Sequence, residues 1–309
     1  MKHIRTSRIP VILLIGALIL GILSSCVANT SLVISGDNTK EVQTDAVEEG
    51  GNGTFQYRLN DAGYYEITGY TPYDVDVVDI VVPGMIGTTE VTSIADQAFY
   101  YCTYVKSITI PASVTSIGDY AFAGCTYLES IVIPDTVLSI GEGLFSNCTS
   151  LTSVKLPADL KVIPKHTFRG CEALESFEIT SVMTEIEQGA FRDCIALKTV
   201  TIPANIERIG AQAYYNCPAL TYFEMQASLD FVLLKDENDA FVLDENGYKI
   251  VDDEKSEIGS YMLYRFSPDI EIVYDASNTG MAAYYAHYAL DKEPPELTTA
   301  GVTTLYAPS

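Results

Sequence analysis

The chain has 309 residues, of which 41 are acidic and 18 are basic, and its net charge at pH 7 is −23. A negative excess of this size argues against nucleic acid or an anionic membrane surface as a partner, because both would repel it. It favours a protein that uses its charge to stay soluble outside the cell.

The N-terminus has the pattern of an export signal. Three basic residues precede an apolar run over residues 11–23, which is too short to span a bilayer comfortably. Residues 23–26 (Leu-Ser-Ser-Cys) resemble a bacterial lipobox, in which the cysteine is lipidated and becomes the new N-terminus. We therefore expect residues 1–25 to be a lipoprotein signal peptide and Cys26 to be the lipidation site. The alternative is an ordinary signal peptide with an incidental cysteine.

The next segment predicts a tether and then a cap. Residues 26–54 are rich in Thr, Ser, Asn, Gly and acidic residues without apolar periodicity, which is typical of a flexible tether. Residues 55–97 predict an N-terminal β cap, beginning with a hairpin that turns at residues 60–63, and an atypical first repeat. In that repeat, Pro83 precedes Pro111 by 28 residues rather than 23. End repeats are expected to be atypical because they cover the open core.

Residues 98–225 contain a 23-residue repeat. Three registers with this period coincide, which indicates a solenoid of stacked turns. They are Cys102, Cys125, Cys148, Cys171, Cys194 and Cys217; Phe99, Phe122, Phe145, Phe168, Phe191 and Tyr214; and Val105, Leu128, Leu151, Leu174, Leu197 and Leu220.

The turn after Cys125 shows why such repeats stack. Ile131 and Ile133 lie at strand spacing and are expected to point inward, while Pro134 lacks an amide donor and closes the strand. Val137 and Ile140 turn inward again on the return limb. One turn alone cannot bury these side chains, so each depends on its neighbours.

The six periodic cysteines are expected to be buried free thiols. Equivalent side chains of a solenoid stack at about 4.8 Å and point the same way, which fits the roughly 90° torsion of a disulfide poorly. A row of ligands also cannot enclose a tetrahedral zinc ion.

The spacing Leu128-x-x-Ile131-x-Ile133 resembles the leucine-rich repeat, and the 23-residue period with Ala-Phe-x-x-Cys-x-x-Leu-x-Ser-Ile-x-Ile-Pro is similar to the BspA-like class of bacterial surface proteins. The resemblance implies a mainly β solenoid with parallel strands. It also implies an adhesion-type role at the cell surface, with an extracellular protein or a glycan as the ligand.

The repeat period is lost after Met225. Residues 226–266 are expected to be an acidic insertion, and residues 267–309 a C-terminal cap and tail. The cap is predicted to contain a strand at residues 270–274 and a helix at residues 281–290, stopped by two prolines. The tail from Leu297 has no periodicity.

The outward strand positions predict a charge-balanced face. Lys106 is expected beside Glu129, Lys155 beside Glu178, and Glu175 beside Lys198, with little stabilisation from each pair. Four tyrosines of the first turns are candidates for an exposed aromatic patch, which would favour binding over a spacer role. They are Tyr100, Tyr101, Tyr104 and Tyr127.

Signals for an enzyme are thin. After signal removal only His166 and His287 remain, and no nucleophile motif accompanies either. Two acidic runs, at residues 236–239 and 252–254, lack the alternating ligands and glycine of a calcium loop. No catalytic residue, metal or cofactor is therefore expected.

The insertion is the favoured ligand-binding segment, because loops added to a rigid scaffold usually carry specificity. Its aromatics Phe231, Phe241 and Tyr248, together with Glu224 on the adjoining edge, are the candidate binding residues. We expect a protein that is lipid-anchored outside the cytoplasm and does not bind nucleic acid. The alternative is a structural or spacer protein of the envelope without a dedicated ligand.

Overall fold

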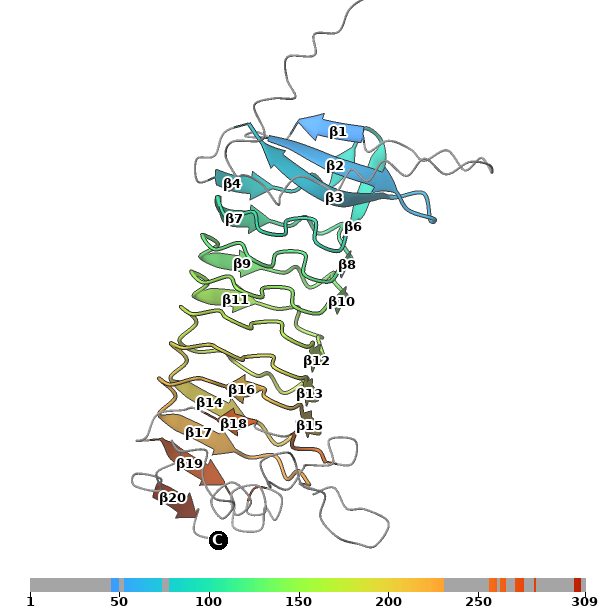
Figure 1. The fold of residues 1–309 in the computed structure, drawn as a ribbon. Helices are drawn as coiled ribbons and strands as arrows, with labels where there is room; N and C mark the ends of the chain where they lie inside the picture. Colours follow the sequence, from blue (N-terminus) through green and yellow to red (C-terminus); the bar gives the residue numbers. More distant parts are fainter. Residues whose placement is uncertain are drawn as a thin grey trace, which may run out of the picture.

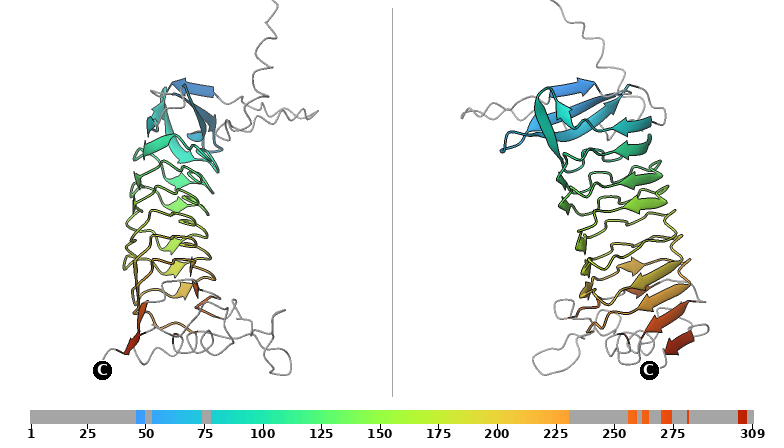
Figure 2. Two further views of the ribbon diagram at one scale, coloured as in Figure 1. Left: turned by 60° about the vertical axis from the view of Figure 1, so that its left-hand side comes forward. Right: turned by 180° about the vertical axis from the view of Figure 1, so that it is seen from behind.

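The protein is an elongated solenoid of stacked turns (Figure 1). The computed structural model describes residues 46–49, 53–73, 78–230, 256–259, 262–264, 270–274, 281 and 303–306. Each full turn has a strand limb and a return limb, and the two limbs run along opposite edges of the molecule from the N-terminal cap to the C-terminal end (Figure 2). The expected mainly β solenoid with parallel strands is confirmed.

An antiparallel sheet covers the N-terminal end of the stack. It consists of β1 (Ala46–Glu49), β2 (Gly53–Leu59) and β3 (Tyr65–Pro72). The expected hairpin joins β2 to β3, and Asn60 closes its turn by donating its backbone N–H to the Tyr64 carbonyl at 2.8 Å. β1 pairs with β2 although it lies within residues 26–54, so regular structure begins earlier than the tether prediction allowed.

The first turn accommodates its extra residues in a small hairpin. β4 (Val78–Val81) forms its strand limb, and β5 (Met85–Ile86) pairs antiparallel with β6 (Thr89–Ile94), which forms the return limb. Gly87, with φ +60°, lies in the tight turn between β5 and β6. β6 also pairs parallel with β3, and this pairing joins the cap to the stack.

The strand limbs pair in parallel with the 23-residue offset that the sequence predicts. They are β7 (Val105–Thr109), β9 (Ser130–Val132), β11 (Ser153–Lys155), β14 (Thr199–Ile202) and β17 (Tyr222–Met225). The sheet is interrupted between β11 and β14, where the bulky Phe177 occupies the inward position and only a single bridge joins Ser176 to Thr199.

The return limbs form a second parallel ladder. They are β8 (Ser116–Ile117), β10 (Ser139–Ile140), β12 (Val162–Ile163), β13 (Glu185–Ile186) and β15 (Arg208–Ile209). Each places one buried isoleucine in the core.

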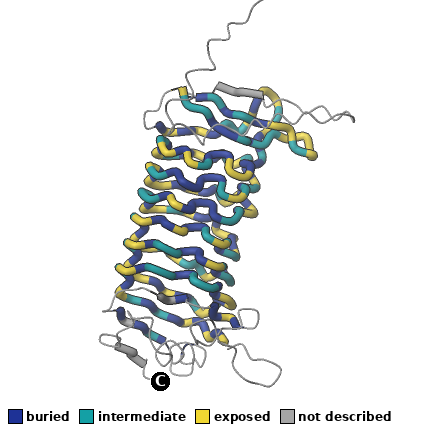
Figure 3. The backbone as a smooth tube through the Cα atoms, viewed as in Figure 1, coloured by how far each residue is buried: buried dark blue, intermediate teal, exposed yellow. Residues whose placement is uncertain are grey.

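The core is one continuous column of apolar side chains between the two ladders. Buried positions accordingly recur in turn after turn of the backbone (Figure 3). The axis of this column is a stack of six rings, whose neighbouring centroids lie 5.1–5.9 Å apart. The stacked residues are Phe99, Phe122, Phe145, Phe168, Phe191 and Tyr214.

The periodic cysteines bind the turns to one another through hydrogen bonds. The Sγ of Cys148 donates to the carbonyl oxygen of Phe122 at 3.1 Å, and that carbonyl also accepts the backbone N–H of Cys125. Equivalent Sγ–carbonyl contacts of 3.1–3.3 Å recur at Cys125, Cys171, Cys194 and Cys217. Cysteine therefore supplies both a small apolar volume and a donor to a buried carbonyl.

Five of the six cysteines are free and buried, as expected. They are Cys125, Cys148, Cys171, Cys194 and Cys217. Cys102 differs from the expected row of free thiols, because it is disulfide-bonded.

The solenoid continues for one more turn than the sequence period indicated. Ile258 bridges Ile209, and β18 (Leu263–Tyr264) pairs parallel with β16 (Tyr214–Tyr215). β19 (Glu271–Tyr274) then pairs parallel with β17. All three pairings have an offset of 49 residues rather than 23, so 26 extra residues precede an otherwise regular turn.

This turn corrects the expected extent of the insertion and of the tail. Residues 256–259 and 262–264 belong to the stack, so the insertion is shorter than residues 226–266. The expected cap strand at residues 270–274 is present as β19. β20 (Thr303–Tyr306) pairs parallel with β19, within the part of the chain expected to lack periodic structure. Apart from Met281, which is helical and buried, the predicted cap helix lies outside the described residues.

We predict that the two faces of β9 tolerate substitution very differently. Ile131 is 3% exposed. The substitution Ile131→Asp would place an unpaired carboxylate in the core and lower the free energy of unfolding by about 3–5 kcal/mol. Glu129→Ala, which removes an exposed side chain two residues earlier, just before β9, should change it by less than about 0.5 kcal/mol. Urea titration of both variants checks this, and equal effects would mean that the strand faces are misassigned.

We also predict that the thiol row makes the protein sensitive to alkali. Burial raises the pKa of Cys125 and Cys217 to about 12, and raises the pKa of Cys148 well above its ordinary value. Above about pH 9 the unfolded chain loses these protons while the folded chain keeps them, so the free energy of unfolding falls as pH rises towards 12.

The Cys148→Ala variant isolates this effect from other titrating groups. Because the variant lacks one such thiol, its free energy of unfolding should fall less steeply with pH above pH 9. The two slopes should differ by about 1.4 kcal/mol per pH unit. Urea titrations from pH 8 to pH 11 measure the two slopes. Parallel slopes for parent and variant would contradict the prediction.

Candidate binding surfaces

Glu224 lies on the outer face of β17, between Thr201 of β14 and Val273 of β19. Its Oε2 accepts hydrogen bonds from the Thr201 and Tyr222 hydroxyls at 3.4 Å, and its Oε1 accepts one from Gln226 Nε2 at 3.1 Å. The carboxylate is half-buried, and the three groups that donate these hydrogen bonds to it are all neutral. It therefore keeps its negative charge available to a ligand.

The rest of the outer strand face is balanced in charge, largely as expected. Lys106 pairs with Glu129 at 3.5 Å, and Lys198 pairs with Glu175 at 2.6 Å. The expected partner of Lys155 is wrong: it pairs with Asp135 at 3.8 Å rather than with Glu178. These side chains are all more than half exposed, so the pairs contribute little to stability.

The described residues include the neck of the acidic insertion. The carbonyl of Asp230 accepts the backbone N–H groups of Glu257 and Ile258, at 2.8 and 3.1 Å. In return, Glu257 Oε2 accepts the backbone N–H of Asp230 at 2.8 Å. The two ends of the insertion are thus held together at the edge of the stack, and residues 231–255 lie between them.

Three of the four predicted binding residues, Phe231, Phe241 and Tyr248, lie outside the described residues. The structure therefore places Glu224 alone, on the strand that leads into the neck through the buried Ala227 and Leu229. Whether the three aromatics approach Glu224 stays a prediction.

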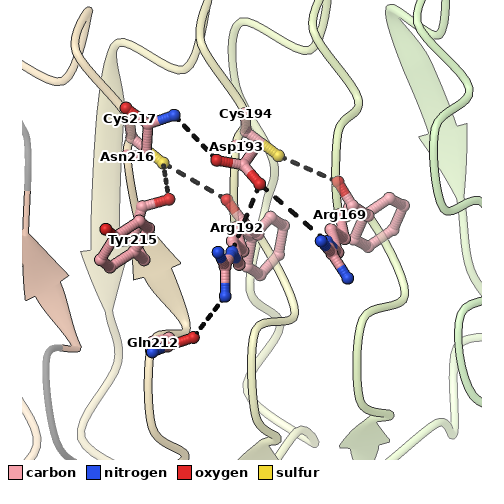
Figure 4. A network of polar contacts seen from close by, with 10 residues as sticks. Arg169, Arg192, Asp193, Cys194, Gln212, Tyr215, Asn216 and Cys217 are labelled. Carbon is pink, nitrogen blue, oxygen red and sulfur yellow. Dashed lines mark hydrogen bonds and ion pairs between the residues drawn. The ribbon is translucent and has the colours of Figure 1, made fainter.

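A second polar surface joins the fourth, fifth and sixth turns (Figure 4). Asp193 Oδ2 forms ion pairs with Arg192 at 3.3 Å and Arg169 at 3.9 Å, while its Oδ1 accepts a hydrogen bond from Asn216 at 2.8 Å. Arg192 also donates to Gln212 Oε1 at 2.6 Å and lies 4.8 Å above the Tyr215 ring.

Sequence reasoning missed this network, although its residues share registers. Arg169, Arg192 and Tyr215 recur at 23-residue steps, and so do Asp193 and Asn216. Because its members satisfy one another, the network acts as a clamp between turns. Both of its arginines are engaged by the one carboxylate of Asp193.

The described residues give no support to a catalytic or metal site. His166 is half-buried, and burial together with the nearby Arg169 lowers its pKa, so its imidazole is neutral at pH 7. No group of three or more His, Cys, Asp and Glu side chains that could hold a metal ion occurs among them. His287 and both acidic runs lie outside this part of the chain. Within it, too, no helix has the length and apolar character needed to cross a membrane.

The expected aromatic patch is present in part. The rings of Tyr100 and Tyr101 contact edge to face, with centroids 4.5 Å apart. Tyr127 is 56% exposed, whereas Tyr104 is half-buried with its hydroxyl enclosed. Tyr120, which sequence reasoning did not include, joins the patch from the second turn.

Comparison with known proteins supports the repeat assignment. Residues 92–221 match, in six copies, the family model described as the BspA type leucine rich repeat region. No curated protein matches the chain.

Solved structures of bacterial leucine-rich proteins are also similar to this chain. A leucine rich cell surface protein from Faecalibacterium prausnitzii is 26% identical, with a TM-score of 0.47; the match covers 69% of this chain and 61% of that one. The T. pallidum leucine rich repeat protein is 21% identical, with a TM-score of 0.41, and the match covers 75% of this chain and 92% of that one. A leucine-rich repeat protein from Bacteroides ovatus is 20% identical, with a TM-score of 0.36 and coverages of 74% and 71%.

Proposed function

Because residues 92–221 of this chain are a BspA-type leucine-rich repeat region, we propose that the protein is a lipid-anchored bacterial surface protein that binds an extracellular protein or glycan through its acidic insertion and Glu224. It uses no catalytic residue and no cofactor. Surface display and ligand binding fit a scaffold whose turns serve to hold a variable segment in place.

The observation that carries this proposal is the neck of the insertion. Asp230 and Glu257 bring the ends of the inserted segment within hydrogen-bond distance, and the solenoid resumes immediately with Ile258 beside Ile209. Twenty-six residues have therefore been added without any loss of stacking on either side. A segment that the scaffold does not need for its own stability is free to serve a ligand.

Glu224 supports the same location. It lies on β17, the strand limb of the seventh turn, and the exposed Gln226 and the buried Ala227 follow it towards the neck. The repeats before it offer a ligand mostly exposed, internally paired charges. Discrimination between ligands therefore falls to the insertion and to the edge that adjoins it.

The anchor rests on the lipobox-like residues 23–26 and on the position of Cys26 outside the repeat register. Lipidation uses the sulfur of Cys26, so that sulfur cannot also take part in a disulfide. Peptide mass analysis of the exported protein therefore distinguishes the two fates of Cys26.

We expect Cys26→Ala to abolish lipid attachment, so that the variant no longer partitions into detergent, whereas Cys148→Ala partitions like the parent. Detergent phase separation of the exported proteins measures this. If the parent yields a peptide in which Cys26 is linked to Cys102, or if Cys26→Ala still partitions with detergent, the anchor proposal is wrong.

We expect replacement of residues 231–255 by a short Gly-Ser link to preserve the thermal transition and abolish ligand capture. The cut is placed between Asp230 and Ser256 because residues 256–264 contribute to the seventh turn. Glu224→Gln should weaken capture, while Glu129→Gln, on the same sheet face but distant in the stack, should not.

Capture is measured with the immobilised mature protein against an extracellular-matrix protein extract and a glycan array that omits the neutral oligosaccharides used in the test of the tyrosine surface below. Unchanged capture without the insertion would assign binding to the repeats themselves. If the intact protein captures nothing from either source, the spacer role is supported instead.

A further inference from the structure

Two rows of left-handed backbone run along one edge of the solenoid. In each row the residues are 23 apart and have φ between +54° and +75°, although most are not glycine. The rows are Gln97, Tyr120, Gly143, His166, Gly189 and Gln212; and Tyr101, Gly124, Asn147, Gly170, Asp193 and Asn216.

In these rows a side chain is laid over the glycine of the following turn. A Cβ on Gly124 would lie 2.9 Å from Cγ and Cδ1 of Tyr101, and one on Gly143 would collide with the Tyr120 ring. The same relation joins Asn147 to Gly170 and His166 to Gly189. The glycines therefore provide the room in which these side chains lie against the backbone.

The first two turns use this arrangement to present aromatic rings. We call Tyr100, Tyr101 and Tyr120 the tyrosine platform. Tyr101 is 41% exposed although part of its ring rests on Gly124, so the side of the ring away from the backbone faces solvent. Tyr100 stands edge-on against it, at an interplanar angle of 85°. Burial, Tyr101 and Tyr120 together raise the pKa of Tyr100.

Polar groups border the platform. Asp119, which precedes Tyr120 in the chain, uses Oδ1 to accept the backbone N–H of Glu142 at 2.8 Å. Asp96 Oδ1 likewise accepts a hydrogen bond from the backbone N–H of Asp119. Both aspartates are exposed, and their second oxygens remain acceptors for further hydrogen bonds.

We propose that the tyrosine platform is a carbohydrate-binding site that takes a neutral oligosaccharide. Its rings offer apolar faces for stacking against the C–H groups of a sugar ring, while tyrosine hydroxyls and aspartate oxygens serve the sugar hydroxyls. Because Tyr101 and Tyr120 rest on glycine backbone, they lose little conformational freedom on binding.

A folded protein partner fits this surface less well. A stable protein interface uses about 20–30 residues on each side and has an apolar centre. The exposed aliphatic side chains among the described residues, such as Val132, Leu138 and Ile195, belong to other registers of the repeat. The platform is thus a small aromatic surface with polar borders, separated along the stack from the insertion after Asp230.

The test measures binding of four neutral oligosaccharides to the mature protein by titration calorimetry: maltopentaose, cellopentaose, chitopentaose and xylopentaose. At least one should bind the parent, and Tyr101→Ala should weaken that binding at least tenfold while Tyr101→Phe largely retains it. Tyr73→Ala, which removes a more exposed tyrosine of the cap, is the control and should bind like the parent.

A second variant tests the arrangement rather than the ring. Gly124→Ala keeps all three tyrosines but displaces Tyr101, so it should also lose at least tenfold in affinity. Its thermal transition is compared with the parent's, and the neighbouring Asn147 shows that this row accepts a side chain at positive φ. Removal of residues 231–255 should leave oligosaccharide binding unchanged, so this site and the proposed insertion site fail or succeed separately.

The proposal is overturned if none of the four oligosaccharides binds the parent, or if Tyr101→Ala and Tyr73→Ala bind equally. Binding of an oligolysine peptide that is lost in Tyr101→Ala, with no saccharide bound, would also overturn it. That result would assign the platform to a basic protein partner.

Discussion

Every turn of this molecule is stabilised by the turn before it and the turn after it. The clearest instance is the carbonyl of Phe122, which accepts the N–H of Cys125 within its own turn and the Sγ–H of Cys148 from the next. The buried carbonyl is thereby fully satisfied, and a buried acceptor without partners would be costly. The period of 23 is therefore fixed from inside, by hydrogen bonds as well as by the stacked rings.

This dependence explains where the chain tolerates variation. Added residues occur in the connections between limbs, as in the β5–β6 hairpin and after Asp230, where the limbs on either side still pair in register. The strand sheet is interrupted at Phe177, which packs between Phe168 and Phe191. Added length is thus accommodated outside the stack.

The inward residues could be predicted because the period alone determines them, as Ile131 and the ring stack demonstrate. The seventh turn could not, because Leu263 stands where the other turns have a ring and the cysteine marker is absent; Ile258-Gly259 was the remaining sequence signal. The partner of Lys155 was missed because a long exposed side chain can reach several carboxylates, and register does not choose among them.

The tyrosine platform, too, could be predicted from the sequence only in part. Four tyrosines of the first turns were visible as a group, but Tyr120 was not, because its place depends on a left-handed backbone. Glycines at Gly124, Gly143, Gly170 and Gly189 were the available sign that both rows adopt positive φ in every turn. The candidate residues of the insertion, by contrast, have no repeating neighbours from which their positions could be inferred.

The buried thiols have a consequence for the life of the chain before it is folded. An exported protein emerges into a compartment where thiols are oxidised, and an unfolded chain would present its cysteines without protection. Once stacked, each thiol is fully enclosed, and burial keeps it in the protonated, unreactive form. Folding and oxidation are therefore in competition, and each turn that docks removes one thiol from the reach of oxidants. A chain built in this way favours rapid, turn-by-turn folding, since local contacts between adjacent repeats form quickly.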